Sequence, residues 1–291
     1  MRNPVLRKEM HATVRSRKLM IGLLFYNVLL ALWAISCFRI NFYDADGLVE
    51  NAYRNITIVF SMIEIAQFIL LAFIVPAVTA GAISGEREKQ TLEILLTTPL
   101  GTRRLIMGKL LSSIGTVLLY IVSSMPILSI VFLVGGISLY DLTYMLLYCF
   151  VFAIFAGSIG IFFSALYKRS ILATVTTYGV GILLCFFPYI AYFLRAINLS
   201  IYEELPSPDW IVAIGLLSPL FSGISLLSIQ IGSSIEFENL CYEMINAKYH
   251  WYQVGEHAWF WISIVVQLVV AGLLLWAAVR YLNPMRKKRW K

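Results

Sequence analysis

The sequence has few charged residues and none of the residue patterns that usually carry chemistry. Asp, Glu, Lys and Arg make up only 13% of its 291 residues, which is about half their share in a soluble domain. The four cysteines form no CxxC pair and no cluster with the three histidines, so neither a disulfide framework nor a metal site is expected. A GxxxxGKS/T phosphate loop, an HExxH or GxSxG motif and a carboxylate pair inside an apolar run are also missing. We therefore predict that the chain alone is not an enzyme and binds no cofactor.

Long apolar runs take the place of such motifs. Apolar residues make up 60% of the chain, and the mean hydropathy is +0.81. A helix needs about 20 apolar residues to cross a bilayer. Six runs are that long: residues 19–38, 58–83, 110–134, 142–166, 171–194 and 259–281. The sequence therefore predicts an all-α polytopic membrane protein, with six transmembrane helices in a single transmembrane domain over residues 1–291.

The distribution of charge predicts the orientation of these helices. If the N-terminus is cytoplasmic, 19 of the 23 Lys and Arg residues fall on cytoplasmic segments, and most acidic residues fall outside. Cytoplasmic segments of membrane proteins carry this excess of positive charge. We therefore expect both termini in the cytoplasm. The net charge of +7 then reflects topology and contact with anionic lipids, and no nucleic-acid partner is expected.

A seventh apolar run, residues 210–231, is ambiguous. If it crossed the membrane, the basic C-terminal segment RKKRWK would lie outside, against the charge rule. Gly215, Pro219 and Gly223 also interrupt it. We therefore predict that residues 196–258 form an extracellular helical region, part of which is re-entrant and packs on the outer ends of the spans.

The N-terminal segment, residues 1–18, shows the pattern of an interfacial helix. Apolar side chains recur on one face and basic side chains on the other. The apolar face carries Leu6, Met10 and Val14, and the basic face carries Lys8, His11 and Arg15. This segment is predicted to lie along the inner leaflet as an elbow before the first span.

Two groups of residues within the predicted spans are candidates for a role in transport or in helix packing. Ser61, Glu64 and Gln67 form a polar stripe, which we place near the outer boundary of the second span, either as a substrate path or as a solvated helix end. Ala156 and Gly160 are four residues apart and allow a helix to approach closely. That approach serves either packing within one bundle or contact with a second subunit.

One charged segment interrupts the apolar runs on the cytoplasmic side. Ser84 can cap a helix whose first turn holds Glu86 and Glu88, and Pro99 stops it. The pattern predicts one continuous helix over residues 84–98, with leucines toward the spans and a polar face toward a cytoplasmic partner. The candidate contact residues are Glu86, Arg87, Glu88, Lys89, Gln90, Thr91, Glu93 and Thr97.

The stretch GAISGEREKQTLEILLTTPLGTRRLIMGK, which contains this helix, resembles the hallmark loop of type-2 ATP-binding-cassette (ABC) exporter permeases. Members of that family carry a pattern of the form SxEREKGTLE-LL followed by a proline and a final GK. Gln90 stands where glycine is common. FFSALYKRSILATVTTYGVG and SPLFS resemble later parts of the family less specifically. The resemblance covers most of the chain.

The resemblance implies a function and a set of partners. Two six-span subunits, identical or related, pair with two separate ATPase subunits that bind ATP and Mg. The helix over residues 84–98 is then the coupling helix, which sits in a groove of the ATPase. The chain is expected in the bacterial plasma membrane, as the permease of an exporter. The small extracellular region and a cavity lined by Phe, Tyr and Leu favour a small amphipathic or peptide-like substrate. A channel or passive carrier outside this family is the alternative.

Overall fold

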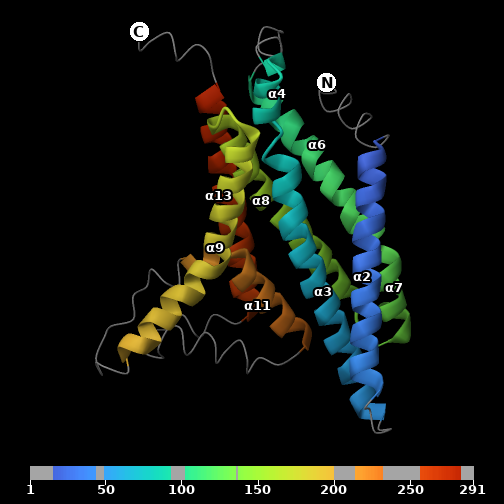
Figure 1. The fold of residues 1–291 in the computed structure, drawn as a ribbon. Coiled ribbons are helices and arrows are strands. Elements are labelled where there is room, and N and C mark those ends of the chain that lie inside the picture. The colour runs from blue at the N-terminus through green and yellow to red at the C-terminus, as the bar shows by residue number, and fades with distance from the viewer. Residues whose placement is uncertain are drawn as a thin grey trace.

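The computed structural model describes residues 16–43, 49–92, 102–135, 137–199, 214–231 and 256–282. All regular elements in these ranges are helices, as predicted. In chain order they are α2 (Arg17–Tyr43), α3 (Val49–Thr79), α4 (Ser84–Glu88), α6 (Thr102–Ser123), α7 (Met125–Val134), α8 (Leu139–Leu166), α9 (Ser170–Leu199), α11 (Pro219–Ile231) and α13 (Glu256–Leu282) (Figure 1).

Six helical segments are long and apolar enough to cross a membrane: α2, α3, α6 with α7, α8, α9 and α13. Large apolar side chains cover their outer faces, as in Leu24, Val175 and Leu273, which are more than half exposed. Such a surface suits contact with lipid. The prediction of an all-α membrane protein with six spans is confirmed.

The third span differs from its prediction. It begins at Thr102 rather than at residue 110, and it is interrupted at Ser124, where α6 ends and α7 begins. Pro126 occupies the first turn of α7, a position where its missing N–H costs no helical hydrogen bond. The Ser124 hydroxyl bonds the carbonyl oxygen of Ile121 at 2.8 Å and the side-chain oxygen of Gln67 at 3.2 Å.

Helix α8 lies at the centre of the bundle and packs against α13, α3, α9 and α6. Gly160 allows its close approach to the end of α3. A Cβ atom at that position would lie 2.8 Å from the Cβ atom of Thr79 and 3.2 Å from the backbone nitrogen of Ala80. The small residues of α8 therefore serve packing within this bundle, which was one of the two predicted roles.

Helix α11 has 13 residues and is about 20 Å long, which is too short to cross a bilayer. Its first residue, Pro219, accepts a 2.8 Å hydrogen bond from the hydroxyl of Tyr148, and its Gln230 amide donates to the carbonyl oxygen of Asp141 at 3.3 Å. On α8, Tyr148 lies about 10 Å deeper than Asp141. Helix α11 therefore enters the bundle obliquely, and it is not among the described helices long enough to cross a membrane. That residues 210–231 do not cross stays a prediction.

The described basic residues at the helix ends support the predicted topology. The start of α2 with Arg17 and Lys18, the short helix α4 and the end of α13 with Arg280 lie at one end of the bundle (Figure 1). We call this the α4 end. Its assignment to the cytoplasm rests on the charge rule and stays a prediction. Most of the interfacial helix predicted for residues 1–18 lies outside the described residues, as does the tail after Leu282.

Candidate functional site

The first candidate site is the short helix α4 and the span ends around it. Helix α4 follows α3 after a turn at residues 80–83. The predicted cap by Ser84 is wrong, because the N-cap residue is Ile83 and makes no side-chain cap. Instead, Ser164 of α8 accepts hydrogen bonds from the backbone N–H groups of Ile83 at 2.8 Å and Ser84 at 2.9 Å. The first N–H groups of a helix need such partners, and here a neighbouring span supplies them.

Helix α4 is much shorter than predicted. It ends at Glu88, and Gln90 has a φ of 58°, so the prediction of one continuous helix over residues 84–98 is wrong. A left-handed residue commonly ends a helix, and glycine adopts that conformation at the least cost. The glycine that the resembling family carries at the position of Gln90 was therefore a signal for this helix end. Leu92 is buried, as predicted for a leucine facing the spans.

Arg87 ties α4 to the end of α8. Its Nη1 and Nη2 atoms donate 3.1 Å hydrogen bonds to the carbonyl oxygens of Tyr167 and Ala165 respectively. Because α8 ends at Leu166, the last carbonyl oxygens of this helix have no N–H partner within the helix. A guanidinium group suits the position because it is planar, carries several donors and complements the negative end of the helix dipole.

Glu88 ties α4 to the start of α9. Its carboxylate accepts hydrogen bonds from the hydroxyl of Ser170 at 2.7 Å and from the backbone N–H of Ser170 at 2.9 Å. These two bonds lower the pKa of Glu88 below its ordinary value. Glu88 thus acts as an N-terminal cap for α9, although the two residues are 82 positions apart.

Glu86 ties α4 to α6. One carboxylate oxygen lies 3.1 Å from Nζ of Lys109, and the other accepts a short hydrogen bond from the Thr91 hydroxyl. Burial raises the pKa of Glu86, but the hydrogen bonds from Thr91 and Lys109 and the positive charge of Lys109 outweigh it, so the pKa is lowered. The carboxylate therefore stays ionised near neutral pH and keeps the ion pair.

The three charged side chains together fix α4 to the ends of three spans, an arrangement that we call the α4 joint. It consists of Glu86, Arg87 and Glu88 with their partners on α6, α8 and α9. Four of the residues predicted to contact a partner, these three and Thr91, are thus engaged within the chain. Among the described candidates, Glu88, Lys89 and Gln90 are exposed. Contact with a partner stays a prediction, and Glu93 and Thr97 lie outside the described residues.

The second candidate site is the polar stripe on α3. Ser61, Glu64 and Gln67 are all buried, with exposed fractions of 3%, 4% and 0%. The alternative of a solvated helix end is therefore wrong for Glu64. The span is longer than its apolar run suggested, and Glu64 lies about 22 Å from the end of α3 at Thr79, which is within the thickness of a bilayer.

The structure does not bring the three residues together into one path. Ser61 donates to the backbone carbonyl of Thr57 within its own helix. Gln67 accepts a hydrogen bond from Ser124, and its amide approaches the Sγ atom of Cys149 at 3.9 Å. Of the three, Glu64 lines a cavity that the structure describes. Contact of Ser61 and Gln67 with a substrate stays a prediction.

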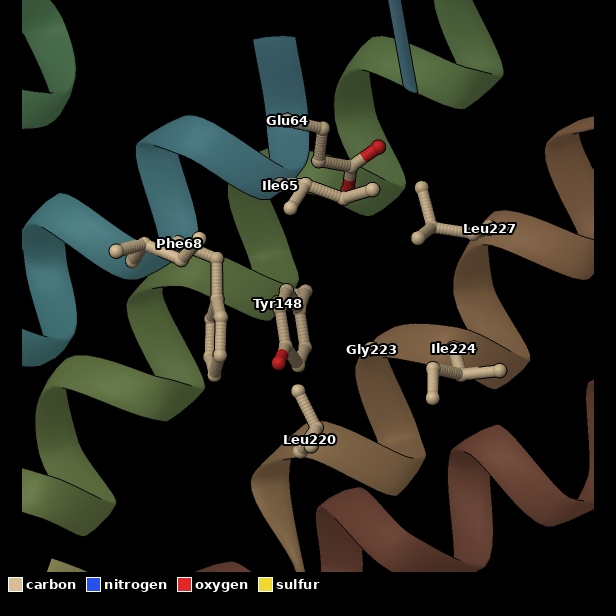
Figure 2. A pocket seen from close by; sticks show the side chains of 9 residues that line it. Glu64, Ile65, Phe68, Tyr148, Leu220, Gly223, Ile224 and Leu227 are labelled. Atoms are coloured by element: carbon tan, nitrogen blue, oxygen red, sulfur yellow. The ribbon is translucent and has the colours of Figure 1, made fainter. Parts of the chain in front are cut away.

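That cavity, which we call the Glu64 pocket, has a volume of about 180 Å³ and lies between α3, α8 and α11. Figure 2 shows the Glu64 side chain reaching from α3 toward the part of the wall that α11 forms. Phe68 and Tyr148 provide aromatic walls, with ring centroids 5.6 Å apart. The other lining residues are apolar or glycine: Ile65, Ile69, Leu220, Gly223, Ile224 and Leu227.

A comparison with protein families gives a match over nearly the whole chain. The family described as "ABC-2 family transporter protein" matches residues 3–282. No curated protein matches the chain.

Proposed function

The chain belongs to the ABC-2 family of transporter proteins, and we propose that it is the permease subunit of an ATP-driven exporter. The α4 joint is the observation that carries this proposal. A helix of five residues has little stability of its own, yet it is fixed by charged side chains to α6, α8 and α9. A force on α4 would therefore be transmitted to three spans at once.

The partner that applies this force is a pair of separate ATPase subunits, which bind ATP and Mg. They dock from the cytoplasm on the segment over residues 84–98, and Glu88, Lys89 and Gln90 offer the described part of that surface. The permease is not catalytic by itself. A second permease subunit, identical or related, completes the transporter, and lipids of the bacterial plasma membrane surround it. No nucleic acid is involved.

The cargo is a small amphipathic or peptide-like molecule. An apolar pocket with one carboxylate supports this, because such a site binds an apolar body together with one polar group. ATP-driven movement of α4 shifts the inner ends of α6, α8 and α9, and these shifts change the access to the pocket between the spans.

Co-purification tests the proposal. The tagged chain is purified from membranes of its own host, and we expect an ATPase to purify with it. The change Lys89→Glu should weaken the complex, because Lys89 is exposed beside the α4 joint. The change Arg39→Glu is the matched control, since it reverses an exposed charge near the opposite end of α2.

Two results would contradict the proposal. One is that no ATPase accompanies the wild-type chain. The other is that the purified chain alone, in liposomes without ATP, moves solutes at the rate measured with the ATPase. The second result would favour the alternative of a channel or passive carrier.

A further inference from the structure

Glu64 is a buried acid whose carboxylate makes no hydrogen bond of normal geometry, although the side chain of Gln230 interacts with it. Its side chain is 4% exposed. The Oε1 atom of Gln230, on α11, also lacks a donor. Buried polar atoms in native proteins are rarely left unsatisfied. Among the described residues, the pocket therefore offers acceptor atoms that no hydrogen bond of normal geometry satisfies.

The space beside Glu64 is lined by aromatic and aliphatic side chains. Phe68, Ile69 and Leu220 line the Glu64 pocket and also a second cavity, of about 360 Å³, between α3, α8 and α9. Neither cavity is lined by Lys or Arg, and Glu64 is the one acidic residue among the lining residues of the two. The two adjacent cavities, which we call the slot, therefore offer apolar walls with a single acidic side chain in the smaller one.

We propose that Glu64 is the counter-charge for an organic ammonium group, so that the cargo is an amphipathic amine. Its N–H groups donate to Glu64 and to Oε1 of Gln230, and its apolar body lies along Phe68 in the slot. The faces of Phe68 and Tyr148 add a cation–π attraction. This inference rests on the proposed function and specifies its substrate class.

A metal ion fits the pocket less well than an amine. Hard cations such as Ca²⁺ take six to eight oxygen ligands, but the side-chain oxygens at Glu64 are few and the walls are apolar. In the part of the chain that the structure describes, no group of three His, Cys, Asp or Glu residues could hold a metal ion. An amine needs only the one carboxylate and an apolar surface.

Direct binding to the purified permease tests this inference. Tritiated decylamine, which is cationic at neutral pH, is bound to the wild-type protein and to the Glu64→Gln variant by scintillation proximity. Loss of a charge-assisted hydrogen bond should weaken saturable binding by roughly tenfold or more in the variant. Tritiated decanol, which has the same chain and no charge, should bind both proteins equally and so shows that the variant is folded. Ile35→Leu, on the exposed face of α2 and outside the lining of both cavities, is the control and should keep wild-type affinity.

The wild-type protein alone provides a second measurement, which does not depend on the folding of a variant. Its affinity for decylamine should exceed that for decanol by roughly tenfold. Equal affinity for the two probes, or equal decylamine binding by wild type and Glu64→Gln, overturns the inference. Displacement of decylamine by NaCl but not by choline chloride also overturns it, because that result identifies an inorganic cation site.

The same variant separates this inference from the proposed function. Glu64→Gln lies far from the α4 joint, so its co-purification with the ATPase should equal that of wild type. A failure of amine binding with an intact ATPase complex would reject only the substrate class. Loss of the ATPase from the wild-type chain would reject the permease function itself.

Discussion

Arg87 should be the most sensitive residue of the α4 joint. It donates two hydrogen bonds to backbone carbonyls at the end of α8, both 3.1 Å long. A hydrogen bond from a charged group contributes about 1.5–3 kcal/mol. Because Arg87 is partly exposed, the lower end of that range applies, and Arg87→Met should cost about 3 kcal/mol for the two bonds. This cost shifts the equilibrium between docked and detached α4 by about a hundredfold.

Arg87→Lys gives an intermediate case with the same charge. An ammonium group is a compact point charge and lacks the planar fork that reaches two carbonyls. We expect it to keep one of the two bonds, so its cost is about 1.5 kcal/mol and the shift about tenfold. Arg39→Met is the matched control, since it removes an exposed positive charge that lies outside both the joint and the proposed docking surface.

The assay compares transport with ATP hydrolysis in proteoliposomes that contain the permease and its ATPase. Arg87→Met should hydrolyse ATP but transport less substrate per ATP than wild type, and Arg87→Lys should lie between them. Arg39→Met should keep the wild-type ratio of transport to hydrolysis. Thermal unfolding of the permease alone should follow the same order. If Arg87→Met has the wild-type ratio of transport to hydrolysis and the wild-type unfolding temperature, the joint does not transmit force and our reasoning is wrong.

Two further predictions concern the packing of α8. Gly160→Ala places a Cβ atom against Thr79 and the backbone of Ala80 and should cost about 1–3 kcal/mol in the free energy of unfolding. Gly157→Ala, whose nearest contacts would be ordinary at 3.5 Å, should leave stability unchanged or raise it slightly; equal unfolding temperatures for the two variants would contradict this. Tyr148→Phe removes one of two hydroxyl donors to the carbonyl oxygen of Pro219, since Ser222 still donates at 2.9 Å, and should cost about 0.5–1.5 kcal/mol. Hydrogen exchange should then be faster in α11, and unchanged protection there would show that this bond does not hold the helix.

The spans could be predicted from the sequence because their signal is local. Each is an apolar run of about 20 residues, a length that the bilayer itself dictates. The interruption of the third span at Ser124 was missed because residues 110–134 are apolar on both sides of it. Pro126 marks the place, but a proline in a transmembrane helix is tolerated often enough that it predicts no break by its presence alone.

The charged loop was only partly predictable, because its partners are distant in the chain. The residues of α4 were predicted to contact a partner because they are charged within an apolar sequence. Their partners could not be identified, since Arg87 bonds backbone carbonyls about 80 residues away, and every residue has such a carbonyl. Glu88 binds Ser170, and nothing in the sequence distinguishes that serine from others. Only the folded arrangement of α8 and α9 brings these partners next to α4.

The depth of Glu64 in the membrane could not be predicted from the apolar run alone. An apolar run measures the hydrophobic part of a helix, but α3 extends over 31 residues, from Val49 to Thr79. The apolar run continues to residue 83, whereas α3 already ends at Thr79. Glu64 is therefore closer to the inner end of its helix than the run indicated, and its predicted place at the outer boundary was too shallow. Its burial also depends on α11, which is separated from it by more than 150 residues in the sequence.

The α4 joint and the Glu64 pocket are connected by two helices, which explains how one can act on the other. Helix α3 carries Glu64 in its middle and leads into α4 at its end. Helix α8 lines the pocket with Tyr148 and accepts the Arg87 hydrogen bonds at its end. Pro76 lies within α3 between the two sites and lines the larger cavity. Because proline has no N–H to donate, one backbone hydrogen bond is already missing there, so α3 can bend at this point at a lower cost than elsewhere. Under the proposed function, a movement of α4 can therefore reach the pocket through the end of α8 and through the short segment of α3 after Pro76.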